Sequence, residues 1–142
     1  MSKTTDNLKT AFAGESQANR KYLAFARKAE EDGLSQVAKL FRAAAEAETI
    51  HAHAHLRLMK GIGTTAENLK EAVAGETYEL KSMYPEMIAD AQAEGEKAAE
   101  RYFVFANKAE ECHANLYAKA AKMLGDLPAV DYYVCSVCGH IH

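Results

Sequence analysis

The sequence contains no tryptophan, only two prolines and few aromatic residues, yet almost half of its 142 residues are hydrophobic. Alanine supplies much of this apolar content, and alanine has the highest helix propensity of all residues. The composition therefore favours closely packed helices over a sheet. The length is that of one ordinary domain, with enough apolar residues for one core.

A large excess of charge is also missing, because the net charge is only −3 and both signs are present. This balance does not suggest a nucleic-acid-binding surface or one for anionic membranes. No apolar run approaches the roughly 20 residues of a membrane span, and residues 1–10 are too polar for a signal peptide. We therefore expect a cytoplasmic protein whose partners include neither nucleic acid nor a membrane.

A Glu-x-x-His motif is present twice, as Glu48-Thr49-Ile50-His51 and as Glu110-Glu111-Cys112-His113, at an offset of 62 residues. Residues three apart on a helix share a face, so each motif offers a carboxylate and an imidazole to one point. A lone glutamate precedes each motif on another helical segment, Glu15 before the first and Glu76 before the second. One copy alone is about what chance would produce, but the shared context predicts a site for two metal ions.

Apolar residues recur in steps of three and four over four segments, residues 8–29, 37–58, 69–87 and 99–124, as on one face of a helix. The predicted ligands fall within these stripes, where core side chains are expected. The second and fourth stripes superpose at the offset of 62, which indicates a duplicated helical hairpin. We expect a four-helix domain over residues 1–125, followed by a linker and a short cysteine-containing tail over residues 126–142.

Glycines and one capping sequence mark the breaks between the predicted helices. Pro85 is the one helix breaker inside a predicted helix, and we expect it to kink the third. The break signals are Gly33, then Gly61 and Gly63 with the capping box Thr64-Thr65-Ala66-Glu67, then Gly95 and Gly125.

Four glutamates aimed at one core require a physical explanation, because an unpaired carboxylate in an apolar core costs several kcal/mol. The alternative is that each glutamate reaches the surface or is protonated, which is less satisfactory for four of them with two histidines at matched spacing. Carboxylate oxygens with a minority of imidazole suit iron or manganese better than structural zinc. Glu79 lies one turn beyond Glu76 on the same face and adds a fifth carboxylate, unless it is an ordinary solvated residue.

These motifs together resemble those of the rubrerythrins, whose ferritin-like di-iron bundle carries one Glu on each of two helices and Glu-x-x-His on the other two. The resemblance covers nearly the whole chain and implies that Glu48 and Glu110 bridge two irons. It also implies that His51 and Glu79 exchange as ligands with redox state. The matching motifs are Phe12-Ala13-Gly14-Glu15-Ser16-Gln17-Ala18, the first Glu-x-x-His, Ala74-Gly75-Glu76-Thr77-Tyr78-Glu79 with Met83-Tyr84-Pro85, the second Glu-x-x-His and the terminal cysteine pair. The implied di-iron ligands are Glu15, Glu48, His51, Glu76, Glu79, Glu110 and His113, with Tyr22 and Tyr84 hydrogen-bonded to ligands beside the site or, alternatively, filling the core.

Three other residues near the motifs are expected not to carry the chemistry. His53 is about 200° round the helix from His51 and should face solvent, and His55 lies one turn past the ligand. Cys112 is similarly turned away from Glu110, so we interpret it as a small buried thiol.

The tail sequence Cys135-x-x-Cys138-Gly139 resembles the first of the two knuckles that hold one iron in a rubredoxin. The other cysteines needed for that centre do not follow in the sequence. Three explanations are open: the sequence is truncated, knuckles from two chains share one iron or zinc ion, or the tail is vestigial. We favour truncation. A cysteine pair in this setting fits metal or redox use better than a disulfide framework.

The short link between the two hairpins constrains how the bundle closes. In an up-down-down-up bundle the second and third helices are parallel, so the chain must return by roughly 30 Å at 1.5 Å per helical residue. Roughly four linking residues reach at most about 14 Å. We therefore predict a domain-swapped homodimer with two di-iron sites, each built from both chains. An up-down-up-down monomer is the alternative.

The resemblance implies a non-haem di-iron peroxidase that reduces hydrogen peroxide to water and takes electrons from a rubredoxin or a reductase. Iron oxidation and sequestration, as in ferritins, is one alternative. Peroxide dismutation, as in manganese catalase, is another, and a purely structural bundle is the least favoured.

Overall fold

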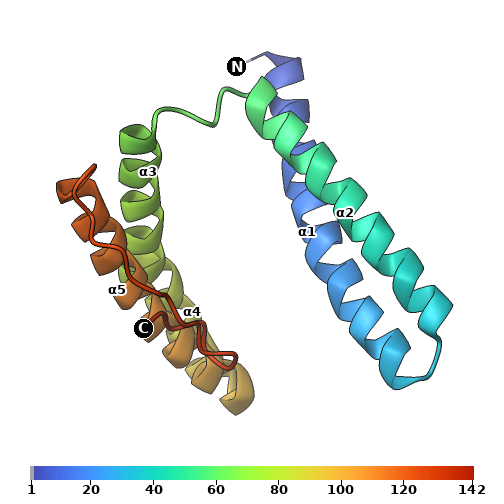
Figure 1. Cartoon of the computed structure of the whole chain (residues 1–142). Coiled ribbons are helices and arrows are strands. Elements are labelled where there is room, and N and C mark those ends of the chain that lie inside the picture. Colours follow the sequence, from blue (N-terminus) through green and yellow to red (C-terminus); the bar gives the residue numbers. More distant parts are fainter. Residues whose placement is uncertain (1) are drawn as a thin grey trace. The chain divides into compact units, whose positions relative to one another are not determined.

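The computed structural model describes residues 2–142, and the predicted all-α class is confirmed (Figure 1). No strand is present in that range, where one isolated bridge joins Val134 and Ile141. The helices are α1 (Lys3–Glu31), α2 (Ser35–Leu58), α3 (Thr65–Tyr78), the π-helical turn η1 (Glu79–Met83), α4 (Tyr84–Glu94) and α5 (Lys97–Lys122). Because α3, η1 and α4 follow one another without a break, they form the predicted third helix.

The chain divides into two compact units, one ending at Ile62 and the other comprising Gly63–His142. In the first unit α1 packs against α2, and in the second α5 packs against α3, η1 and α4. Each unit is thus one of the two predicted helical hairpins. The tail after residue 125 belongs to the second unit, and its status as a separate domain stays a prediction.

Small residues bring α1 and α2 together. The buried core of this unit consists of alanines, among them Ala26, Ala38 and Ala45. Asn19 is the one buried polar residue among residues 2–142, and its Nδ2 donates hydrogen bonds to Ala45 O at 2.7 Å and to Thr49 Oγ1 at 2.8 Å. Because both amide hydrogens have acceptors, burial of this side chain carries a small cost. The interaction fixes the register of the two helices beside the predicted ligands.

The second unit begins with the predicted capping box, which is confirmed. Glu67 N donates to Thr64 Oγ1 at 3.3 Å, and Thr64 N donates to Glu67 Oε2 at 2.7 Å. Two backbone donors at the start of α3 are therefore satisfied. Further along, the regular α-helix is interrupted by η1 directly before Pro85, which lies at the start of α4.

The tail lies against α5 (Figure 1). Tyr133 N donates to His142 O at 3.1 Å, and His142 N donates back to Tyr133 O at 2.8 Å. Cys112 Sγ on α5 lies 3.1 Å from Ile141 O, to which it donates. The tail is thus a small hairpin-like turn that α5 anchors through a side chain.

None of the helices within residues 2–142 combines the length and the apolarity that a membrane span requires.

We expect Thr64→Ala to lower the free energy of unfolding of the second unit by about 1 kcal/mol, because the α3 cap is lost. Thr65→Ala is the matched control, since Thr65 is the first residue of α3 and does not form the cap. Urea unfolding followed by helical circular dichroism measures both. Equal effects of the two substitutions would contradict the role given to the cap.

Candidate metal centre

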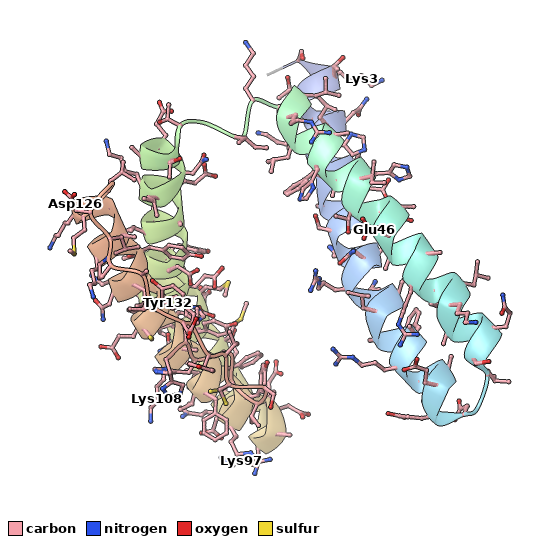
Figure 2. All side chains as sticks on the ribbon, viewed as in Figure 1. Lys3, Glu46, Lys97, Lys108, Asp126 and Tyr132 are labelled. Atoms are coloured by element: carbon pink, nitrogen blue, oxygen red, sulfur yellow. The ribbon has the colours of Figure 1, made fainter. Side chains whose placement is uncertain are left out.

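The first unit brings together Glu15 from α1 with Glu48 and His51 from α2. One ligand atom of each lies within 4.8 Å of the others. His51 Nδ1 is 3.1 Å from Glu48 Oε2 and 4.0 Å from Glu15 Oε1. Glu46, labelled in Figure 2, identifies the stretch of α2 from which two of these side chains come. The spacing of three residues on α2 places Glu48 and His51 on one face, as expected.

The second unit assembles the equivalent group, Glu76 from α3 with Glu110 and His113 from α5, again within 4.8 Å. His113 Nδ1 is 2.7 Å from Glu110 Oε2 and 3.4 Å from Glu76 Oε2. The two groups have the same residue types in the same helical arrangement. Six of the seven predicted ligands are therefore in two matched groups of three, one in each unit.

Carboxyl groups pair closely in both groups. Burial, and then the hydrogen bond to Glu110, raises the pKa of Glu76 to about 7. In the first unit the hydrogen bond to Glu48 raises the pKa of Glu15, and the same bond lowers the pKa of Glu48. Two carboxylates at this separation repel, which favours the protonated form of one of them in the metal-free protein.

This donor set fits a metal ion. A cation placed among two carboxylates and an imidazole replaces the shared proton and neutralises the paired charge. Oxygen donors with one imidazole per group suit iron or manganese. The groups could also release a proton when the ion binds, since the ligand atoms must be deprotonated.

Glu79 lies outside the group of three, although it is close to two of its members. Burial raises the pKa of Glu79, then the negative charge of Glu110 raises it further, while His113 lowers it. Glu79 lies in η1. The first unit has no carboxylate at the equivalent position, because offsets of 61 and 62 place Ala18 and Gln17 there.

The π-helical turn reflects one extra residue in the second hairpin. The offset between the repeats is 61 from Ala13-Gly14-Glu15 to Ala74-Gly75-Glu76, but 62 from Tyr22 to Tyr84. The additional residue therefore falls between Glu76 and Tyr84, where η1 lies. An α-helix can take up one extra residue as a π-turn, and such turns are frequent at functional sites. This change of offset is visible in the sequence between the first and third helical segments. It is not visible between the second and fourth, whose offset is constant at 62.

The two histidines differ in exposure. The side chain of His51 is 56% exposed, whereas that of His113 is 17% exposed. Ligands that the apolar stripes assign to a core are thus only partly covered by one hairpin. Large apolar side chains are exposed as well, including Leu40 and Ile50 on α2 and Tyr102 on α5.

Within residues 2–142 the expected hydrogen bonds from Tyr22 and Tyr84 to ligands are not present. Tyr22 instead contacts the ring of Phe41, with ring centroids 6.1 Å apart, and Tyr84 contacts Phe103 at the same separation. Burial, and then the charge of Glu110, raises the pKa of Tyr84. Tyr84 therefore lies close enough to the Glu76, Glu110 and His113 group for the charge of Glu110 to affect its pKa.

Of the three residues expected not to carry the chemistry, His53 and Cys112 lie outside the ligand groups, whereas His55 lies near one of them. His53 is exposed, and Cys112 is half-buried and hydrogen-bonded to the tail. His55 is half-buried, and its Nδ1 has no hydrogen-bond partner within residues 2–142. His55 also lies near enough to Glu15 to lower the pKa of that carboxyl slightly.

The surroundings of the cysteine pair in the tail favour the thiolate form of Cys135. Backbone N–H groups of Cys138 and Val137, and then the Cys138 side chain, lower the pKa of Cys135. Both thiols are free and half-buried. No third ligand joins them among residues 2–142, so the predicted metal at this pair stays a prediction.

Residues from outside the motifs also contact the second group. His113 Nε2 donates a hydrogen bond to Gly139 O at 2.9 Å. Tyr132, labelled in Figure 2 on the tail over α5, lines an apolar cavity with His113, Leu116 and Ile141. Backbone carbonyls have no sequence signature, so motif spacing could not have predicted this contact.

For the metal-free protein, we expect Glu76 to make stability depend on pH between about 4.5 and 7. The folded state binds this proton more tightly than the unfolded chain, so its stabilising effect is full below pH 4.5 and is lost as pH rises to about 7. Glu76→Gln should remove a decrease of about 1 to 3 kcal/mol over that window. Urea unfolding after metal chelation measures it, with Glu71→Gln on the exposed side of α3 as control. An unchanged pH profile in Glu76→Gln would contradict the assignment.

Known proteins resemble the chain over nearly its whole length. The rubrerythrin family profile matches residues 6–121. Rubrerythrin-2 of Clostridium acetobutylicum is 36% identical over 96% of this chain and 83% of its own length. Nigerythrin of Nitratidesulfovibrio vulgaris is 39% identical over 98% of this chain and 76% of its own length.

Solved structures of nigerythrin show the same fold. Its partially reduced state has a TM-score of 0.57 at 36% identity, covering 100% of this chain and 77% of that one. Its fully reduced, all-ferrous state has a TM-score of 0.55 at 38% identity, with the same coverage. The ferritin-like class expected from the motifs is thereby confirmed, and the chain belongs to the rubrerythrin family.

Proposed function

We propose that this protein is a non-haem di-iron peroxidase that reduces hydrogen peroxide to water. The observation that carries the proposal is the pair of matched Glu, Glu and His groups, each with ligand atoms within 4.8 Å. The family relation supports a di-iron, peroxide-scavenging oxidoreductase in general. One relative, nigerythrin, has a solved all-ferrous state, so iron is the metal of that protein.

The residues proposed to hold two irons are the six of the matched groups together with Glu79. Glu48 and Glu110 are proposed to bridge the ions. When bound, two ferrous ions would supply the two electrons that cleave the O–O bond of peroxide. The full ligand set is Glu15, Glu48, His51, Glu76, Glu79, Glu110 and His113.

Peroxide reduction also consumes two protons, and the carboxyl groups are suited to hold them. Glu79 is partly buried beside Glu110, and its raised pKa favours the protonated form. If Glu79 and His51 exchange as ligands, Glu79 could transfer a proton while it is not bound to iron. Tyr84, whose pKa is raised by burial and by the charge of Glu110, keeps its hydroxyl proton at neutral pH.

We further propose that the complete site forms in a domain-swapped homodimer. The link between the hairpins supports this, because Lys60 N donates to Arg57 O and Gly61 N donates to Leu56 O. These bonds keep the chain turned as far as the N–H of Gly61, so the extended link begins at that residue. The four residues Gly61–Thr64 span at most about 14 Å. The first hairpin of one copy would then supply Glu15, Glu48 and His51 to the second hairpin of another.

The proposed electron donor is a rubredoxin or a reductase outside this chain. The tail supports a role in electron entry, because backbone N–H groups stabilise the Cys135 thiolate. An iron or zinc ion held by Cys135 and Cys138 would need further ligands, which a second chain could supply.

Anaerobic protein loaded with two ferrous ions per site should be oxidised at least tenfold faster by hydrogen peroxide than by oxygen. Stopped-flow absorbance measures both rates. Glu48→Gln and Glu110→Gln should each slow the peroxide reaction at least tenfold, whereas Glu46→Gln, an exposed neighbour on α2, should not. Faster oxidation by oxygen would favour iron storage instead, and gas evolution without reductant would favour dismutation.

Light scattering of the iron-loaded protein should give the mass of a dimer, and metal analysis should give four irons per dimer. Mixing chains that carry Glu48→Gln with chains that carry Glu110→Gln tests the swap. In a swapped heterodimer one of the two sites contains neither substitution, so mixing after unfolding and refolding should restore up to a quarter of the wild-type activity. A fully metal-loaded monomer would rule the swapped assembly out.

A further inference from the structure

Asn107 on α5 is a polar residue beside the ligands to which the proposed function gives no role. Its side-chain oxygen, Oδ1, is buried and has no hydrogen-bond partner within residues 2–142. Buried acceptors in folded proteins almost always have a partner, so a vacant one requires an explanation. Asn19, the buried asparagine of the first unit, differs in that its amide group is hydrogen-bonded across the hairpin.

Asn107 stands level with Glu79 on the neighbouring helix. Glu76 on α3 and Glu110 on α5 are hydrogen-bonded to each other, and α5 also contacts η1, where Glu79 lies. Asn107 precedes Glu110 by three residues, and Glu79 follows Glu76 by three. In an antiparallel hairpin these are steps of about 4.5 Å in the same direction, and residues three apart share a face. Asn107 and Glu79 therefore form the next level of the hairpin beside the hydrogen-bonded glutamates.

The two residues are present together in one hairpin and absent together from the other. The offset of 62 between α2 and α5 places Ala45 at the position of Asn107. Gln17 and Ala18 stand at the position of Glu79. The first hairpin therefore has neither member of the pair, which indicates that the two side chains act together.

A side-chain amide can hold a carboxyl group in either protonation state. Oδ1 accepts a hydrogen bond from the protonated group, and Nδ2 donates to the carboxylate. In the structure the Glu79 carboxyl lies where the charges of Glu110 and His113 act on it, and Asn107 Oδ1 is vacant. Because Glu79 and Asn107 stand level, rotation of the Glu79 side chain can bring its carboxyl to Asn107 while the helices stay in place.

We propose that Asn107 is a positioning residue that holds the Glu79 carboxyl by hydrogen bonds whenever this carboxyl is not bound to a metal ion. The inference rests on the proposed function, in which Glu79 is a metal ligand. Asn107 gives the free carboxyl a fixed position one helical turn from the ligand group, away from the negative charge of Glu110. Metal binding by Glu79 then requires the rotation of one side chain and no movement of a helix.

NMR of the asparagine side-chain amides in the full chain tests the proposal, first after metal chelation and then with zinc. Without metal, the charge of Glu110 repels the Glu79 carboxyl and favours its bond to Asn107. The amide hydrogens of Asn107 should therefore exchange with water at least tenfold more slowly in the wild type than in Glu79→Ala. Zinc should draw Glu79 to the ligand group and remove this protection, with no effect on Asn107 in Glu79→Ala.

Glu86→Ala is the matched control for Glu79→Ala, because Glu86 is an exposed glutamate on α4. It should leave exchange at Asn107 unchanged. Asn115, an exposed asparagine on α5, is the internal reference, and its amide should respond neither to Glu79→Ala nor to zinc.

Asn107→Leu separates this role from simple core filling, with urea unfolding of the metal-free protein as the measurement. Leucine has a similar size and removes a buried polar group, so it should raise the urea midpoint in the Glu79→Ala background. In the wild-type background it should not, because it also deprives Glu79 of its partner.

Equally fast exchange at Asn107 in the wild type and in Glu79→Ala would overturn the pairing, and so would an equal effect of Asn107→Leu in both backgrounds. Zinc binding that leaves the Asn107 amide unchanged would overturn the movement of Glu79. Coupling of the two residues in a protein that binds no zinc would instead overturn the metal site of the proposed function, and with it the ligand role of Glu79.

Discussion

Repulsion between paired carboxylates is the constraint on which this fold depends. Each hairpin places two glutamates within reach of one histidine nitrogen, and in each the pKa of one glutamate is raised by its neighbour or by burial. A proton or a cation placed between such groups relieves their repulsion. The alanine-rich contact between α1 and α2 supplies little stabilising area to offset that cost. We therefore expect a bound cation to stabilise each hairpin.

Duplication explains the symmetry of the centre, and one extra residue explains its asymmetry. The matched groups follow from two hairpins with the same helical spacing. The extra residue between Glu76 and Tyr84 widens one turn into η1, where Glu79 lies, whereas the first hairpin has no carboxylate at the equivalent position. The tail adds a second difference by contacting His113 and not His51. Two chemically similar halves thus offer two different metal environments.

Much of the architecture was predictable from the sequence because helical periodicity is a local property. The four helical segments, the Thr64 capping box and the grouping of Glu48 with His51 all depend on residues a few positions apart. The meeting of Glu15 with that pair required the hairpin as well, and the repeat suggested it. Tyr22 and Tyr84 contact the rings of Phe41 and Phe103 in their own hairpins, which fits the alternative of core filling, and their hydrogen bonds to ligands stay a prediction.

The sequence by itself determined which residues can bind metal, because ligand type and helical spacing are written in the order of the residues. It also carried the shift of the repeat from 61 to 62 that marks η1. Only the tertiary structure decided how each ligand is held: that burial and Glu110 raise the pKa of Glu76, how far His51 and His113 are exposed, and that Gly139 contacts His113. These depend on contacts between distant segments, and a backbone carbonyl is the same in every residue.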